Sequence, residues 1–215
     1  MTNKSEYEKK YTKNIFSKEN DFDGEGRMLT AIGAINSNIG NYELALTHYN
    51  KALIAYSKTK DAPSSASIDA FDVNTAVISM NIGLIHFKKE SYRNAEAAFN
   101  DAIKKLTIKH HVFYIKDCYL LLSQIKLALN EVGAAAVFAR KSLELNQQLN
   151  TKSGILSSKV LKAQIQYAND KDKGVKAMEG LMNQVSKSQD FEIKKLVYEF
   201  LYNAYKNQEK WEPSL

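Results

Sequence analysis

Two stretches of this chain carry the same residue types at the same spacings. Residues 32–53 read IGAINSNIGNYELALTHYNKAL, and residues 82–103 read IGLIHFKKESYRNAEAAFNDAI. Each begins with isoleucine and glycine, has a tyrosine nine positions after that glycine, an alanine three positions later and an aromatic residue four positions after that. Both then end on an alanine and an aliphatic residue. Agreement at so many positions indicates an internal repeat.

The composition favours helices along the whole chain. Only 2 prolines and 9 glycines occur in 215 residues, and 44% of the residues are hydrophobic, which is enough for a continuous core. The 30 basic and 24 acidic residues are interleaved, so the net charge of +6 describes a solvated surface. The densest basic stretch, residues 104–111, lacks interleaved aromatic residues, and we do not expect this domain to bind nucleic acid.

The single cysteine, Cys118, lies in an apolar helical run and excludes an internal disulfide, which favours a reducing compartment. The first residues contain no apolar stretch typical of a signal peptide, and no window is apolar enough for a membrane span. We therefore expect a cytoplasmic location and no membrane partner.

The repeated residues resemble the tetratricopeptide repeat family, whose unit is a pair of antiparallel helices. The residues that carry this resemblance are Gly33, Tyr42, Ala45, Tyr49, Ala52 and Leu53 in the first unit and Gly83, Tyr92, Ala95, Phe99, Ala102 and Ile103 in the second. The resemblance implies an all-α fold, a right-handed α-α superhelix of about four to five helix-turn-helix units. Small residues would let the helices approach closely, and the aromatic residue would fill the wedge toward the next unit.

Further units follow with weaker matches. Leu122 and Ser123 replace the Ile-Gly pair in the third unit, and the fourth, aligned on Ala177 and Leu181, has lost the glycine and the tyrosine. We expect an N-terminal capping segment at 1–20 and a repeat domain at 21–215, with units at about 26–60, 76–109, 116–150, 158–189 and 195–215. Residues 211–215 align with 42–46, so the last unit is expected to be truncated and the chain to be a fragment of a longer protein.

Three local features refine this map. The Pro- and Ser-containing stretch 61–70 is expected to be a loop, and residues 24–26, Gly-Glu-Gly, a flexible break before a helix. Residues 172–188 are expected to form one helix.

No motif with chemical function is visible. The four histidines form no metal-ligand pattern with carboxylates or cysteine, and no phosphate-binding loop or nucleophile pairing occurs. We expect no catalytic residue, no metal and no cofactor, and a protein that is not an enzyme.

In the family the first helix of each unit lines a concave face. Matched spacing selects a peptide-binding groove with an apolar centre and polar ends: Arg27, Thr30, Ser37, Met80, Leu84, Phe87, Lys88, Leu120, Gln124, Leu127, Lys162 and Gln166. Such a groove suits an amphipathic helix or an extended peptide. The alternative is that these residues are buried against neighbouring helices in a tightly wound superhelix.

These expectations lead to two functions. The first is an interaction scaffold that binds a protein or peptide partner on its concave face. The long helices also resemble those of bacterial regulatory proteins of this family. That resemblance implies the alternative, a ligand- or peptide-sensing regulatory domain of a larger transcriptional or signalling regulator, with an output domain in the same longer chain.

Overall fold

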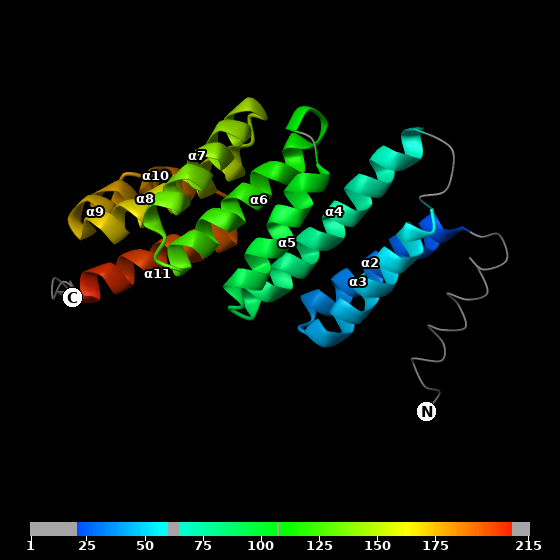
Figure 1. Cartoon of the computed structure of the whole chain (residues 1–215). Coiled ribbons are helices and arrows are strands. Elements are labelled where there is room, and N and C mark those ends of the chain that lie inside the picture. The colour runs from blue at the N-terminus through cyan, green and yellow to red at the C-terminus, as the bar shows by residue number, and fades with distance from the viewer. Residues whose placement is uncertain (1–20, 60–64, 107, 208–215) are drawn as a thin grey trace. The chain divides into compact units, whose positions relative to one another are not determined.

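The computed structural model describes residues 21–59, 65–106 and 108–207, and every regular element in these ranges is a helix (Figure 1). The helices are α2 (Phe22–Asn38), α3 (Tyr42–Ser57), α4 (Ser65–Lys88), α5 (Tyr92–Lys105), α6 (Ile108–Ala128), α7 (Val132–Gln148), α8 (Lys152–Asn169), α9 (Lys171–Glu179), α10 (Met182–Lys187) and α11 (Phe191–Asn207). Helices adjacent in the chain pack together in pairs. The expected all-α helical-repeat fold is confirmed. The expected capping segment, 1–20, and the alignment of 211–215 lie outside the described residues.

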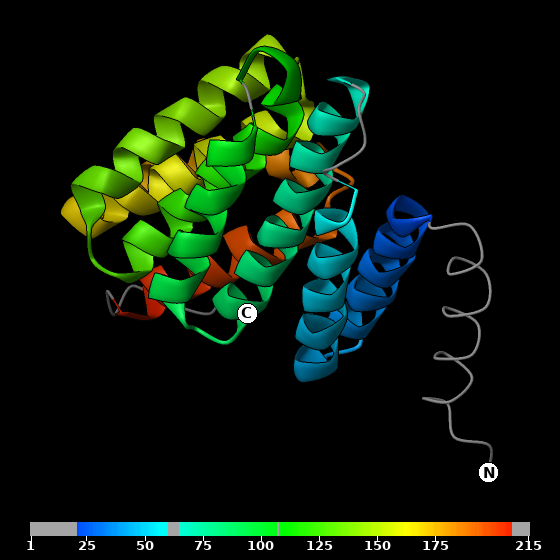
Figure 2. The ribbon, with the colours of Figure 1, turned by 45° about the vertical axis from the view of Figure 1, so that its right-hand side comes forward.

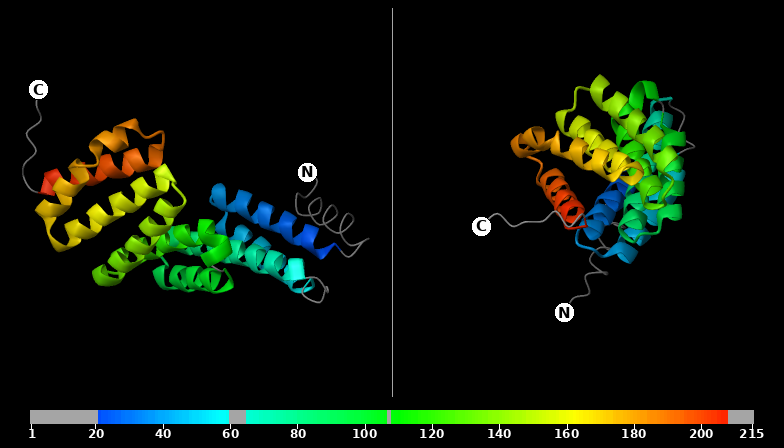
Figure 3. Two further views of the ribbon diagram at one scale, coloured as in Figure 1. Left: turned by 90° about the horizontal axis from the view of Figure 1, so that it is seen from above. Right: turned by 90° about the vertical axis from the view of Figure 1, so that its left-hand side faces the viewer.

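The chain divides into two compact units, Met1–His111 and Val112–Leu215, which we describe separately. The boundary coincides with a kink in α6, where His111 leaves the helical conformation with φ −121° and ψ 25°. In the first unit α2 pairs with α3 and α4 with α5, and α3 also packs on α4 (Figure 2). In the second unit α8 packs on both α7 and α9, and α9 and α10 lie beside α11 (Figure 3).

An aromatic ring seated on a glycine joins the helices of each pair in the first unit. A Cβ atom placed on Gly33 would lie 2.6 Å from Cε1 of Tyr49, and one on Gly83 would lie 3.0 Å from Cζ of Phe99. Both rings are fully buried. Tyr49 belongs to the same apolar cluster as Ile78 of α4, so the ring also connects its own pair to the next helix.

Three local expectations from the sequence are wrong. Residues 24–26 lie inside α2, where Gly26 makes room for the Tyr56 ring, 2.7 Å from the position of a Cβ atom. The expected loop at 61–70 is shorter, because α4 begins at Ser65. The expected single helix at 172–188 is divided into α9 and α10.

A common three-residue turn follows α2, α4, α6 and α7. Its central residue has a positive φ in each case, at Gly40 (83°), Glu90 (56°), Asn130 (59°) and Asn150 (52°). The next backbone N–H donates back to the carbonyl five residues earlier, as from Ser91 to His86 at 2.9 Å. This arrangement satisfies carbonyls that a helix end leaves unpaired.

Glu90 is the least suitable residue for this turn, because it carries a Cβ in the left-handed region without the local hydrogen bonding of asparagine. We expect Glu90→Gly to raise the free energy of unfolding by about 0.5 kcal/mol, as relief of strain exceeds the added entropy of the unfolded chain. Gly40→Ala should lower it by about 1 kcal/mol. Urea unfolding of the whole chain measures both. A stabilised Gly40→Ala variant would contradict this account of the turns.

A polar contact joins α4 to α5. The Ser79 hydroxyl lies 2.6 Å from Oδ2 of Asp101, and Lys105 Nζ lies 2.6 Å from the same oxygen and 3.1 Å from the Ser79 hydroxyl. Burial raises the pKa of Asp101, but the hydrogen bonds from Lys105 and Ser79 and the nearby lysine charges outweigh it and leave this pKa below the ordinary aspartate value. The ionised form of Asp101 therefore makes more favourable interactions in the folded protein than the protonated form does.

A carboxyl group with a depressed pKa stabilises the fold above its unfolded pKa, and this contribution is lost as the pH falls through the folded pKa. We expect Asp101→Asn to destabilise the protein at pH 7, and the difference from wild type to shrink as the pH falls below about 4. Unfolding free energies across this range measure it. The Lys105→Met background is the control, since the pH dependence of Asp101→Asn should be much weaker there.

Candidate functional site

The second unit contains a pocket of about 380 Å³ whose walls come from α6, α8 and α11. This volume falls within the usual size of ligand sites. The lining residues are Leu120 and Gln124 of α6, Ser157, Val160, Leu161 and Gln164 of α8, and Asp190, Glu192, Ile193, Lys195, Leu196 and Glu199 at and along α11.

The lining divides into an apolar floor and a polar rim. Val160, Leu161 and Ile193 are buried, and Leu120 and Leu196 are half-buried beside them. The rim consists of amide, hydroxyl and charged groups, with the charged groups on the α11 side. Few polar groups above an apolar floor are typical of a site that holds an apolar side chain and orients its backbone.

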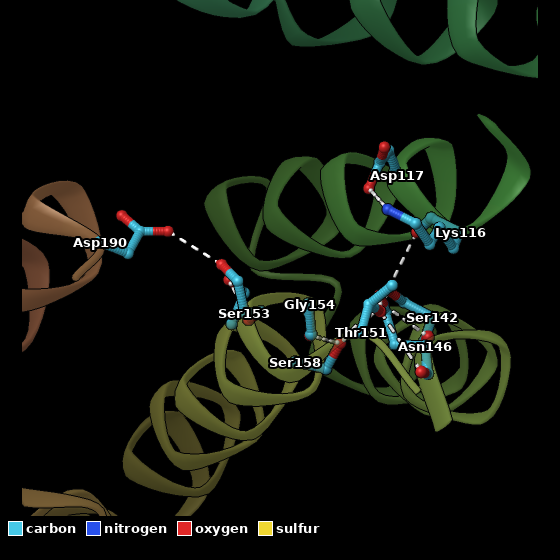
Figure 4. Close-up of polar contacts among 10 residues, drawn as sticks. Lys116, Asp117, Ser142, Asn146, Thr151, Ser153, Gly154, Ser158 and Asp190 are labelled. Carbon is cyan, nitrogen blue, oxygen red and sulfur yellow. Dashed lines mark hydrogen bonds and ion pairs between the residues drawn. The ribbon is translucent and has the colours of Figure 1, made fainter. Parts of the chain in front are cut away.

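A buried hydrogen-bond network holds α6, α7 and α8 together near this pocket (Figure 4). The Ser142 hydroxyl donates to the Lys116 carbonyl at 2.9 Å, and Asn146 Nδ2 donates to the Ser142 carbonyl at 2.9 Å. The Ser158 hydroxyl of α8 lies 3.3 Å from that of Ser142. Buried polar groups with satisfied partners restrict the relative positions of the helices that carry them.

Gly154 leaves the space that this network needs. Thr151 donates its hydroxyl to Oδ1 of Asn146 at 2.6 Å, and a Cβ on Gly154 would lie 1.8 Å from that same oxygen. Any larger residue at position 154 would displace the amide. The start of α8 is therefore held against the end of α7 by a contact that only glycine permits.

Asp190 connects the starts of α8 and α11. Its Oδ1 accepts the backbone N–H of Ile193 at 3.1 Å, and its Oδ2 accepts the Ser153 hydroxyl at 3.0 Å (Figure 4). An aspartate that precedes a helix satisfies one of the N–H groups left free at its first turn. The same carboxylate therefore begins α11 and joins it to α8, which positions two walls of the pocket.

The groove residues expected from the sequence occupy different environments in the second unit. Leu120 and Gln124 line the pocket. Leu127 packs, half-buried, against the apolar cluster between α7 and α8. Lys162 and Gln166 are exposed on α8 and do not line the pocket.

The sequence alignment of the fourth helix-turn-helix repeat, α8 and α9, differs from the structure by two residues, and this accounts for the difference. The sequence alignment placed Ala177 at the position of Ala135, but the structure buries Val175 there and leaves Ala177 only half-buried. When the alignment of α8 is corrected by the same two residues, Val160 and Gln164 replace Lys162 and Gln166 as the expected groove residues. Val160 and Gln164 do line the pocket. The structure explains this register by the close approach of α9 to α8 at Gly174, where a Cβ would lie 2.2 Å from the Tyr167 backbone.

The remaining expected groove residues belong to the first unit. Arg27 is exposed and pairs with Asp23 at 3.1 Å, and the Thr30 hydroxyl donates to the Gly26 carbonyl at 2.8 Å. Phe87 is half-buried and packs edge-on against Tyr92 at 6.0 Å between ring centroids. Met80 and Leu84 are half-buried, Ser37 is buried and Lys88 is exposed. The expected groove residues are thus divided between the two compact units.

Side chains that can bind metal ions, and the cysteine thiol, are further features of the described residues. Within them no group of three or more His, Cys, Asp or Glu side chains could hold a metal ion. Burial raises the pKa of the Cys118 thiol to about 12, so this thiol stays protonated at neutral pH. In the same part of the chain, no helix combines the length and the apolar character that crossing a membrane requires.

Comparison with known families identifies the repeat. Residues 26–58 and 76–104 each match the family model described as tetratricopeptide repeat; the first segment covers most of α2 and all of α3, and the second covers the C-terminal half of α4 and nearly all of α5. A search of curated proteins found no significant match. Folds of this type are typically scaffolds without catalytic function, and their repeats generally mediate interactions between proteins. The two matches, together with the pairwise packing of the helices, show that the chain is similar to tetratricopeptide repeat proteins over residues 26–58 and 76–104.

Proposed function

We propose that the chain binds a polypeptide partner through the pocket of the second unit. The observation that carries this proposal is the composition of the pocket, an apolar floor surrounded by a polar rim on the first helices of successive units. Transferring one large aliphatic side chain from water onto such a floor contributes about 1.5–3 kcal/mol, and a few such anchors supply most of the affinity of a typical interface.

The two glutamines of the pocket suit the backbone of a bound peptide. Gln124 of α6 and Gln164 of α8 are half-buried in the lining. Each amide has two donors and one acceptor oxygen, so a pair of them can bond the N–H and C=O groups of an extended segment. An apolar anchor and backbone hydrogen bonding together describe recognition of a peptide better than recognition of a small metabolite.

The regulatory alternative would use the same pocket. A sensing domain of a longer regulator would, in addition, couple peptide binding to a change in conformation. Small-angle scattering of the longer protein with and without bound peptide separates the two functions, since a scaffold requires no change in the scattering radius.

Filling the pocket tests the proposal. Short peptides enriched from a displayed random library on the whole chain are the probe, and Gln164→Trp places a large ring in the lining. We expect this variant to lose about tenfold or more in affinity for the enriched peptides, since the ring occupies the volume that the anchor needs. Fluorescence anisotropy with labelled peptides measures the affinities.

Two further tryptophan variants complete the experiment. Gln148→Trp makes the same exchange at an exposed position of α7 and should leave the affinity unchanged. Lys162→Trp separates the two registers of α8, because the sequence alignment placed Lys162 in the groove. If Lys162→Trp abolishes binding and Gln164→Trp does not, the peptide binds elsewhere than in this pocket.

A further inference from the structure

We propose that the second-unit pocket selects a basic segment, one in which a bulky apolar side chain is flanked by lysine or arginine. This inference rests on the proposed function and specifies the chemistry of its partner. Basic residues outnumber acidic ones in the whole chain by 30 to 24, yet the pocket lining contains three carboxylates and one ammonium group. The pocket therefore has the opposite charge balance to the chain that surrounds it.

Among the described residues, the nearby lysines outside the lining form no ion pair with its carboxylates; they are Lys159, Lys162 and Lys194. Lys159 of α8 lies 3.3 Å from the side-chain oxygen of Gln184, and Lys162 is exposed outside the lining. Lys195 does line the pocket, four residues before Glu199 on α11. Among the described residues it forms no ion pair with Glu192 or Glu199, although both lie within one turn of it. A lysine that precedes a glutamate by four residues is also the weaker orientation for such a pair.

The three carboxylates differ in how much they contribute to the stability of the fold. Asp190 is engaged by the Ile193 N–H and the Ser153 hydroxyl. Glu192 lies in the first turn of α11, where negative charge favours the helix dipole. Glu199 lies in the middle of α11, where neither effect operates, and no described residue forms an ion pair with it. Glu199 lines the pocket and is exposed, so its carboxylate can pair with a cationic ligand without losing a contact that the fold needs.

Position next to an apolar floor strengthens this selection. Glu192 and Glu199 are exposed in the unbound chain. A peptide that covers the apolar floor would exclude water from an ion pair formed beside it, and such a pair gains more than a fully exposed one does. Glu192 and Glu199 are seven residues apart on one side of α11, which separates them by roughly 10 Å along the helix axis. In an extended segment, residues two positions before and two positions after an anchor point to the same face as the anchor and lie roughly 13 Å apart, a distance that flexible lysine or arginine side chains can adjust to the two carboxylates. The geometry thus fits two cationic side chains on either side of one apolar anchor.

Synthetic peptides test this chemistry directly. We would measure, by fluorescence anisotropy with the whole chain, three labelled peptides of one extended scaffold. One has a central leucine with a lysine two residues before it and another two residues after it, one has glutamates in place of the lysines, and one keeps the lysines but has serine in place of the leucine. We expect the first to bind about tenfold or more tightly than either of the others, and its affinity to fall as salt is added.

The matched variants are Glu199→Lys and Glu144→Lys. Both change the net charge by the same amount, but Glu144 is an exposed residue of α7 paired with Arg140 at 3.9 Å, outside the pocket. Glu199→Lys should weaken the lysine-flanked peptide about tenfold and narrow its preference over the glutamate-flanked one, while Glu144→Lys has little effect at physiological salt. Circular dichroism and the unfolding midpoint show that both variants fold.

The outcomes separate this inference from the proposed function. If Gln164→Trp abolishes binding of both charged peptides but Glu199→Lys changes neither, the pocket binds peptides without charge selection and only this inference is overturned. The same holds if Glu144→Lys acts as strongly as Glu199→Lys, because attraction is then a property of the whole surface. If none of the three peptides binds while library-enriched peptides bind and are lost in Gln164→Trp, again only this inference is overturned. If Gln164→Trp has no effect on the enriched peptides, the proposed function is overturned as well.

Discussion

The first unit depends on the contact between a buried aromatic ring and a glycine on the facing helix. The Tyr49 ring occupies the space where Gly33 would carry a Cβ, and Phe99 does the same at Gly83. Because only glycine lets the helix approach the ring this closely, the pair Gly33 and Tyr49 sets the distance between α2 and α3. Tyr49 also packs with residues of α4, so the same ring fixes the first step from one pair to the next.

The second unit reaches close helix packing with polar contacts in place of the ring. In the third helix-turn-helix repeat, Ala139 takes the position of the aromatic residue. The small alanine leaves room for Ser123, at the position where the first two repeats have Gly33 and Gly83. The Ser123 hydroxyl uses that room to donate to the Ala135 carbonyl at 2.7 Å. Hydrogen bonds are directional where apolar contacts are not, so the buried Ser142, Asn146 and Ser158 network confines the helices to fewer arrangements at the cost of burying polar groups.

This difference between glycine–aromatic packing and buried polar contacts explains which parts of the structure could be predicted from the sequence. Gly33, Tyr49, Gly83 and Phe99 are recognisable as a repeat because close packing restricts their side chains, and the fold class and most helix positions followed from them. Of the residues that the sequence placed in a peptide groove, Leu120 and Gln124 of α6, where Ser123 anchored the alignment, line the pocket. On α8 no such anchor exists, and the choice between Ala177 and Val175 depends on burial that only the packed structure reveals.

The residues of α11 that line the pocket were not predicted from the sequence, for a physical reason. The pocket lining includes three carboxylates at solvent-accessible positions, where any polar residue is compatible with the fold; they are Asp190, Glu192 and Glu199. Helical spacing alone does not distinguish a carboxylate that caps a helix from one that lines a pocket. The distinction appears only when the partners are known, since Asp190 is engaged by Ile193 and Ser153. A helix that is capped by one carboxylate can present another without loss of its own stability. The cap at Asp190 thus holds α11 in place while Glu199, more than two turns further along, remains available to a ligand.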